Sequence, residues 1–156
     1  GGHCISVDPW FFVFDYPGLA NIILAARKIN DSMPEFVLGR IYDIMEENNI
    51  HDVSRVGFYG LTYKEDVDDI RESPTLQLFQ CMKRHLCGND AKFYDPYVKE
   101  EVVTNQYYEL HDFLEQIDIV VIMVAHKEIC LAVGLLSGKI VLDTKNQLQG
   151  IDAYKL

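Results

Sequence analysis

The 156-residue sequence predicts an α/β fold, a Rossmann-like parallel sheet with helices on both faces, preceded by a helical arm. Short, nearly continuous apolar runs bounded by turn residues indicate strands that are buried on both faces, as in a parallel sheet. Helical periodicity between these runs indicates crossover helices. A hydrophobic content of 49% and a charged content of 24% are typical of a globular domain.

The pattern changes near residue 53, and we therefore expect two domains, residues 1–52 and residues 53–156. Residues 1–17 begin with a Gly-Gly turn and continue as an aromatic run at residues 10–14. Residues 18–50 predict a helix that is broken once, with Ser32 as the N-cap of the second part and Pro34 in its first turn. The first part places its apolar residues on one face: Leu19, Ile22, Ile23, Ala26 and Ile29.

From residue 53 onward, strands and helices alternate. We expect strands at residues 56–61, 91–94, 117–125 and 140–142, because these runs are short and apolar. Helices are expected at about 74–86, 107–116 and 127–136. Ser73 followed by Pro74 is a combined N-cap and first-turn signal for the first of these helices.

Charge and composition exclude several classes of partner. A net charge of −10 disfavours nucleic acid and anionic membranes, and no apolar run approaches the length of a membrane span. The first residues lack the features of a signal peptide, and the four cysteines form no CxxC pair, which favours a cytoplasmic location. Cys81 and His85 share a helix face that Cys87 does not join, and without a fourth ligand we expect no metal site.

Ligands of parallel sheets bind beyond the carboxyl ends of the strands, so the residues that follow each strand are the candidate site. Those segments are residues 62–73, 95–97, 126–127 and 143–146. Three of the four contain lysine or arginine and two contain tyrosine, side chains that suit a nucleotide diphosphate.

The first of these loops differs from a dinucleotide-binding turn. Gly57 and Gly60 precede it, but no GxGxxG is present and the next helix begins about a dozen residues later. We therefore expect that the domain does not hold NAD in the usual Rossmann manner and that Lys64 and Arg71 act through their side chains. Most acidic residues of the loop are interpreted as solvated turn residues, with one or two orienting Arg71.

Cys4 is a candidate nucleophile at the start of the chain. It follows Gly1 and Gly2, whose small size allows close approach of a ligand, and it precedes Asp8 by four residues. A thiolate at this position can attack a carbonyl carbon, and Asp8 can position a water molecule. Taken alone, the pattern fits a small apolar cysteine better.

Several motifs together resemble the UDP-glucose/GDP-mannose dehydrogenase family. Residues 1–11, GGHCISVDPWF, resemble its catalytic-cysteine motif, in the version found in members that oxidise UDP-N-acetyl-D-mannosamine. Residues 60–74, GLTYKEDVDDIRESP, resemble its long GLxxKxxxDDxRxSP signature. Asp95-Pro96 and Asp143-Thr144-Lys145 match two further motifs in the same order. The resemblance covers essentially the whole chain and identifies it as the C-terminal part of a family member.

The resemblance implies an NAD-dependent oxidation of the C6 alcohol of a UDP-sugar to a carboxylate, in the service of polysaccharide biosynthesis. Cys4 would carry the thiohemiacetal and thioester, and Asp8 would assist hydrolysis. Gly1, Gly2, Tyr63, Lys64 and Lys145 would bind the substrate, with Lys145 where the family often has arginine, and Arg71 would reach the cofactor phosphates. The helix at residues 18–30 would be the central helix that builds a homodimer.

The family's N-terminal NAD-binding domain has no counterpart in these 156 residues. We therefore expect the isolated chain to lack dehydrogenase activity while retaining weak binding of a UDP-sugar. The motifs favour N-acetylmannosamine and leave open glucose, N-acetylglucosamine and N-acetylgalactosamine derivatives. A stand-alone UDP-sugar-binding module without catalysis is the alternative from another functional class.

Overall fold

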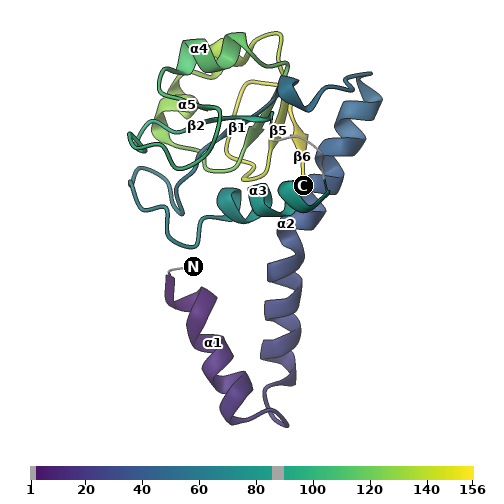
Figure 1. The fold of residues 1–156 in the computed structure, drawn as a ribbon, viewed down its shortest axis with the longest axis vertical. Coiled ribbons are helices and arrows are strands. Elements are labelled where there is room, and N and C mark those ends of the chain that lie inside the picture. Colours follow the sequence, from purple (N-terminus) through teal and green to yellow (C-terminus); the bar gives the residue numbers. More distant parts are fainter. Residues whose placement is uncertain (1–2, 86–89) are drawn as a thin grey trace.

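The computed structural model describes residues 3–85 and 90–156, which form an α/β layer structure with a two-helix arm beneath it (Figure 1). The arm comprises α1 (His3–Asp15) and α2 (Asn21–Glu47). The other helices are α3 (Pro74–His85), α4 (Leu110–Glu115) and α5 (Lys127–Leu131), with 3-10 turns at Val53–Arg55 and Val133–Leu136. The strands are β1 (Val56–Tyr59), β2 (Lys92–Tyr94), β3 (Gln106–Tyr107), β4 (Ile119–Ile122), β5 (Ile140–Asp143) and β6 (Tyr154–Lys155).

All strand pairs are parallel, and the order across the sheet is β3-β2-β1-β4-β5-β6. This is the order of a doubly wound fold, so the predicted α/β class is confirmed. The four predicted strands form the centre of the sheet, where Phe58 of β1 pairs with Phe93 on one side and Val121 on the other. The two edge strands were not predicted, because two residues are too few to produce a periodic signal.

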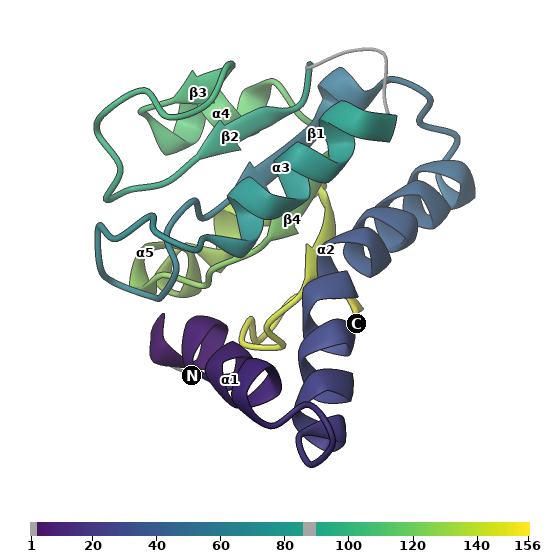
Figure 2. The same ribbon diagram turned by 60° about the horizontal axis from the view of Figure 1, so that its bottom comes forward.

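Helices cover both faces of the sheet (Figure 2). Alternate strand residues point to opposite faces, which divides the buried side chains into two cores. One core joins the sheet to α2 and α3 through residues that include Ile41, Ile44, Phe58, Leu78 and Phe93. The other joins it to α4 and α5 through residues that include Tyr59, Tyr94, Phe113, Val120 and Ile129.

The predicted break in the second helix is wrong, since α2 continues without interruption through Pro34. Ser32 is not an N-cap: its hydroxyl donates to the carbonyl of Ile29 at 2.8 Å, inside the helix. An interior proline removes one backbone hydrogen bond and costs about 3 kcal/mol. Val37, Ile41 and other apolar residues after the proline are buried against the sheet, and this burial offsets the cost.

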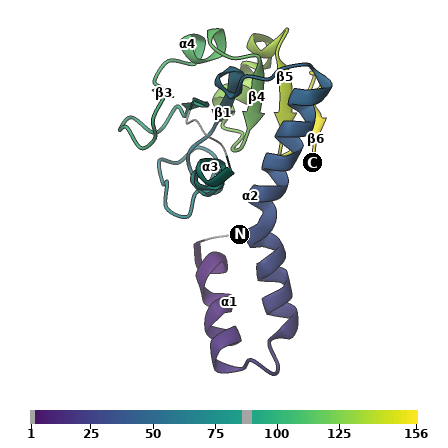
Figure 3. The ribbon, with the colours of Figure 1, turned by 45° about the vertical axis from the view of Figure 1, so that its right-hand side comes forward.

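Residues 3–15 form a helix that the sequence did not predict, and α1 lies antiparallel beside the N-terminal half of α2 (Figure 3). Its aromatic side chains remain largely open, with Phe11 63% and Phe14 86% exposed. Leu19, just before α2, is 86% exposed, and Ile22, in the first turn of α2, is 85% exposed. The described part of the chain therefore leaves the apolar surface of the arm uncovered. None of its helices combines the length and hydropathy that a membrane span requires.

Candidate functional site

The carboxyl ends of β1 and β4 meet where the strand order reverses, which is the usual ligand crevice of a doubly wound sheet. The loop that leaves β1 begins at Gly60, whose φ is +96°. A Cβ atom at this position would lie 2.6 Å from Val124 Cβ and 2.7 Å from Val124 N. The Gly60 carbonyl accepts a 2.6 Å hydrogen bond from the Thr75 hydroxyl, which ties the loop to the start of α3.

A buried carboxylate anchors the start of this loop. Asp95, directly after β2, accepts hydrogen bonds at Oδ2 from the amides of Leu61 (2.6 Å) and Thr62 (3.1 Å), and at Oδ1 from the amide of Tyr97 (2.8 Å). His126 Nε2 lies 3.1 Å from the same Oδ2. Burial opposes ionisation of the carboxyl, but these hydrogen bonds outweigh it and hold the pKa of Asp95 below its ordinary value.

The fully buried His126 anchors the middle of the same loop. Its Nδ1 accepts from the amide of Asp66 at 2.9 Å, which assigns a neutral ring with the proton on Nε2. In return, Asp66 Oδ1 accepts from the amide of Lys127 at 3.0 Å, and the Lys127 ammonium lies 3.1 Å from Oδ2. The amide of Lys127 is the main cause that lowers the pKa of Asp66. Lys64 lies between the two anchored segments.

A second buried carboxylate, Asp143 at the end of β5, anchors the loop that carries Lys145. Its Oδ1 accepts from the amide of Lys145 at 3.0 Å. Its Oδ2 accepts from the amides of Gln147 (2.9 Å) and Leu148 (2.8 Å). Both basic loops of the predicted site are thus held through backbone amides, which leaves the two lysine side chains exposed.

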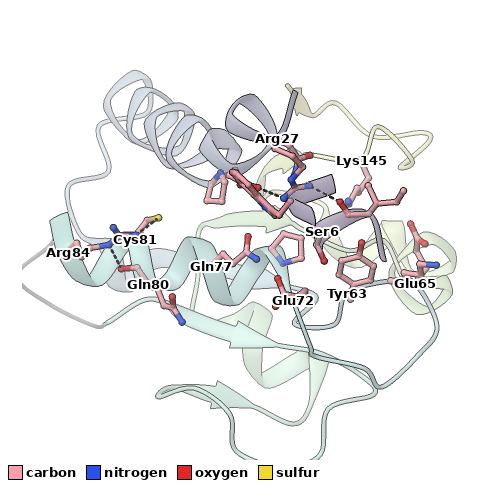
Figure 4. A pocket seen from close by; sticks show the side chains of 17 residues that line it. Ser6, Arg27, Tyr63, Glu65, Glu72, Gln77, Gln80, Cys81, Arg84 and Lys145 are labelled. Carbon is pink, nitrogen blue, oxygen red and sulfur yellow. Dashed lines mark hydrogen bonds and ion pairs between the residues drawn. The ribbon is translucent and has the colours of Figure 1, made fainter. Parts of the chain in front are cut away.

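A cleft of about 870 Å³ separates the arm from the α/β layer (Figure 4). The predicted substrate-binding residues Tyr63, Lys64 and Lys145 all line it, as do Ser6 and Trp10 of α1. Polar residues of α2, α3 and the loop after β1 also line it: Arg27, Asn30, Asp31, Glu65, Glu72, Gln77, Gln80 and Arg84. The structure therefore brings Tyr63 and Lys64 of the loop after β1 together with Lys145 of the loop after β5 and with residues of α1, which are far apart along the chain.

The other predicted site residues lie outside the lining. Cys4 and Asp8 are exposed one helical turn apart and share a face of α1. Ser6, which lines the cleft, is two residues from each of them, about 200° around the helix, so this face points away from the lining. Gly1 and Gly2 lie outside the described residues. Arg71 is 78% exposed and pairs with Asp69 through two hydrogen bonds, from Nε to Oδ1 at 2.9 Å and from Nη2 to Oδ2 at 2.7 Å. Asp69 is thus an acidic loop residue that orients Arg71, as the sequence predicted.

The described residues offer no turn that fits the pyrophosphate of NAD. The loop after β1 has no glycine-rich turn, and α3 begins only at Pro74, with the amide of Leu76 already bonded to Ser73 Oγ at 3.3 Å. Arg71, the residue predicted to reach the cofactor, is paired with Asp69. Among the described residues, no group of three potential metal ligands occurs. Cys87, which was considered as a ligand together with Cys81 and His85, lies outside the described residues.

Arg27 of α2 is a cleft residue that the sequence analysis missed. Pro9 has no amide hydrogen, so the Ile5 carbonyl lacks its helical partner. The Arg27 guanidinium donates to that carbonyl at 3.1 Å and pairs with Asp31 on its other side. The side chain is only 11% exposed. Arg27 therefore fastens the first turns of α1, next to Cys4, to the longer helix.

Replacing Arg27 with methionine is expected to loosen α1, because methionine keeps the apolar stem but loses the hydrogen bond and the ion pair, worth roughly 1.5–3 kcal/mol. Trp10 is the only tryptophan of the chain and lines the cleft, so its fluorescence reports the docking of α1. We expect a red-shifted emission and an earlier thermal transition. The exposed Lys28 of the same helix supplies the control, Lys28→Met. Equal spectra for both variants would contradict the assignment.

Comparisons with known proteins agree with this geometry. Residues 57–150 match the UDP binding domain of the UDP-glucose/GDP-mannose dehydrogenase family. The UDP-N-acetyl-D-mannosamine dehydrogenase of Methanocaldococcus jannaschii is 38% identical over 156 residues, which are 95% of this chain and 34% of that protein. An NDP-N-acetyl-D-galactosaminuronic acid dehydrogenase of Ralstonia nicotianae is 34% identical over 149 residues, covering 93% of this chain and 34% of its own length.

Solved structures show the same relationship. The UDP-N-acetyl-mannosamine dehydrogenase of Staphylococcus aureus aligns with a TM-score of 0.79 at 30% identity, over 99% of this chain and 37% of that one. The enzyme of Pyrococcus horikoshii aligns with a TM-score of 0.82 at 27% identity, over 99% and 38%. The chain thus spans about a third of the length of these relatives. It belongs to the UDP-glucose/GDP-mannose dehydrogenase family, to whose UDP binding domain residues 57–150 correspond.

Proposed function

We propose that the chain is the substrate-side part of an NAD-dependent dehydrogenase that oxidises the C6 alcohol of UDP-N-acetyl-D-mannosamine. The observation that carries the proposal is the cleft in which Tyr63, Lys64 and Lys145 meet. Two ammonium groups on backbone-anchored loops suit the negative charge of a diphosphate. The preference for N-acetylmannosamine rests on the names of the relatives that are similar over 95% of this chain.

In this proposal, residues 53–156 bind the UDP-sugar, while residues 1–52 supply Cys4 and the central helix. The Cys4 thiolate would attack the C6 aldehyde, forming a carbon–sulfur bond and giving a thiohemiacetal. After oxidation to the thioester, water would displace the thiol and release the carboxylate, with Asp8 accepting a proton from the water. The oxidant would be NAD, which the described residues do not fit. The isolated chain is therefore expected to be inactive as a dehydrogenase.

The exposed apolar surface of the arm supports the proposal that α2 builds a homodimer. Large exposed apolar surface on a globular protein is a mark of interaction sites. The side chains that carry it are exposed by between 57% and 86%: Phe11, Phe12, Phe14, Leu19, Ile22, Ile29 and Phe36. A cytoplasmic location and a role in polysaccharide biosynthesis belong to the same proposal.

The binding of UDP to the purified chain, measured by calorimetry, tests the proposed site. Replacing Lys64 with methionine is expected to weaken binding by roughly ten- to hundredfold, because a hydrogen bond to a charged group contributes about 1.5–3 kcal/mol. The exposed Lys99 lies outside the cleft lining, so Lys99→Met carries the same charge change as a control. Absence of UDP binding by the unchanged chain, or equal loss in both variants, would refute the proposal.

A further inference from the structure

The backbone of the loop that carries Lys64 is attached at its centre by one histidine ring, beside the contacts of the Asp66 side chain with Lys127. The ring of His126 and the carboxylate of Asp95 are both completely buried. The chain of contacts runs from Asp95 Oδ2 to His126 Nε2 (3.1 Å) and from His126 Nδ1 to the amide of Asp66 (2.9 Å). Asp66 adopts a φ of +58°, a conformation that non-glycine residues rarely hold without support.

The contact between His126 Nε2 and the Thr62 hydroxyl also fixes the tautomer of the ring. The Thr62 hydroxyl donates to the carbonyl of Lys64 at 2.9 Å, so its oxygen can only accept from His126 Nε2, at 3.3 Å. The Nε2 proton is therefore shared between Thr62 and Asp95, and Nδ1 is left as the acceptor for Asp66. One neutral ring thus connects both ends of the segment in which Lys64 lies.

We propose that His126 is a positioning residue for the nucleotide-binding cleft, and that protonation of its Nδ1 releases the loop and weakens nucleotide binding. The inference rests on the proposed function, since Lys64 is the group being positioned. A proton on Nδ1 would face the amide hydrogen of Asp66, so a hydrogen bond would be replaced by two opposed donors. An unpaired buried donor is costly, and the loop can escape by moving toward solvent.

Several other groups pack around the His126 ring. Asp95 faces its Nε2 and the amide of Asp66 faces its Nδ1. Two aromatic rings lie against it, Tyr97 with centroids 4.9 Å apart and Tyr59 at 5.9 Å. On its own helix, the neighbouring charged residues are Lys127, which pairs with Asp66, and Glu128, which accepts from Tyr59 and Tyr94.

Two replacements of His126 separate its hydrogen bond from its titration. In His126→Asn the side-chain oxygen stands near the position of Nδ1 and accepts from Asp66 at any pH. In His126→Leu no acceptor remains. Both variants lose the contact of His126 Nε2 with Asp95, so only the acceptor for the Asp66 amide distinguishes them. We expect His126→Leu to bind roughly five- to tenfold more weakly than His126→Asn at pH 8, the effect of one hydrogen bond.

Calorimetric titration with UDP-N-acetylglucosamine between pH 8 and pH 5.5 is the test, because the diphosphate of this probe does not titrate in that range. Affinity of the unchanged chain is expected to fall toward that of His126→Leu at low pH, whereas His126→Asn keeps its affinity. Far-UV circular dichroism at each pH verifies that the fold persists. Parallel pH profiles for the unchanged chain and His126→Asn would overturn the inference.

A second readout works without any ligand. The amide of Asp66 is expected to be protected from hydrogen exchange at pH 8 in the unchanged chain and in His126→Asn, but not in His126→Leu. Lowering the pH should reduce its protection factor only in the unchanged chain. An unprotected Asp66 amide at pH 8 would overturn the inference even if nucleotide binds. Protection without nucleotide binding would instead refute the proposed function and leave the role of His126 in place.

Discussion

Replacing Asp95 with asparagine is expected to lower the free energy of unfolding by roughly 2–4 kcal/mol, because it removes a buried charge that accepts several hydrogen bonds. The asparagine NH2 group would face one of the donors that now converge on the carboxylate, from Leu61, Thr62, Tyr97 and His126. Denaturation by urea at pH 7 measures the loss. The matched control is Asp68→Asn, an exposed aspartate in the loop that Asp95 anchors.

The same substitution should change how stability depends on pH. The pKa of Asp95 lies below its ordinary value in the folded chain. Its contribution is therefore fully present above the pKa of the unfolded carboxyl, near pH 4, and is lost as the pH falls through the lower folded pKa. The acid-side slope of stability should be shallower in Asp95→Asn than in the unchanged chain. Identical slopes, or equal destabilisation by Asp68→Asn, would show that Asp95 is not the anchor.

Replacing Gly60 with alanine is expected to destabilise the fold by roughly 2–4 kcal/mol, through a left-handed backbone conformation and an overlap with the neighbouring strand segment. The overlap involves the backbone of Val124, which cannot move aside without disturbing the end of β4. Gly134→Ala is the control, because no heavy atom lies within 4 Å of its added Cβ and its φ is not positive. Urea denaturation compares the two, and similar stabilities would contradict the close approach at Gly60.

The centre of the fold could be predicted from sequence because its strands are buried on both faces. Runs such as residues 119–122 are apolar without alternation, which leaves few alternatives to a parallel strand. The arm was harder. Pro9 and Pro34 are helix-breaking signals, yet both lie inside helices, since tertiary contacts decide whether a helix survives a proline.

The candidate site could be predicted in part. Lys64 and Lys145 were found because they follow strand ends in a parallel sheet and occur in motifs of a known family. The anchors were not singled out, although Asp95 and His126 stand in the same strand-end segments. Their burial depends on contacts across about thirty residues, from Asp95 to Leu61 and to His126, and no local pattern encodes such distances. Arg27 was missed for the same reason, because its partner Ile5 lies on another helix.

The most direct test of the account is to map the binding of UDP-N-acetyl-D-mannosamine by two-dimensional 1H–15N NMR. If the cleft between the arm and the α/β layer is the nucleotide-sugar site, the largest shift changes should fall on the amides of Tyr63, Lys64 and Lys145 and on the indole of Trp10, all of which line it. Shift changes confined to the hollow formed by residues 139–141 and 152–154, or no changes at all, would contradict the account.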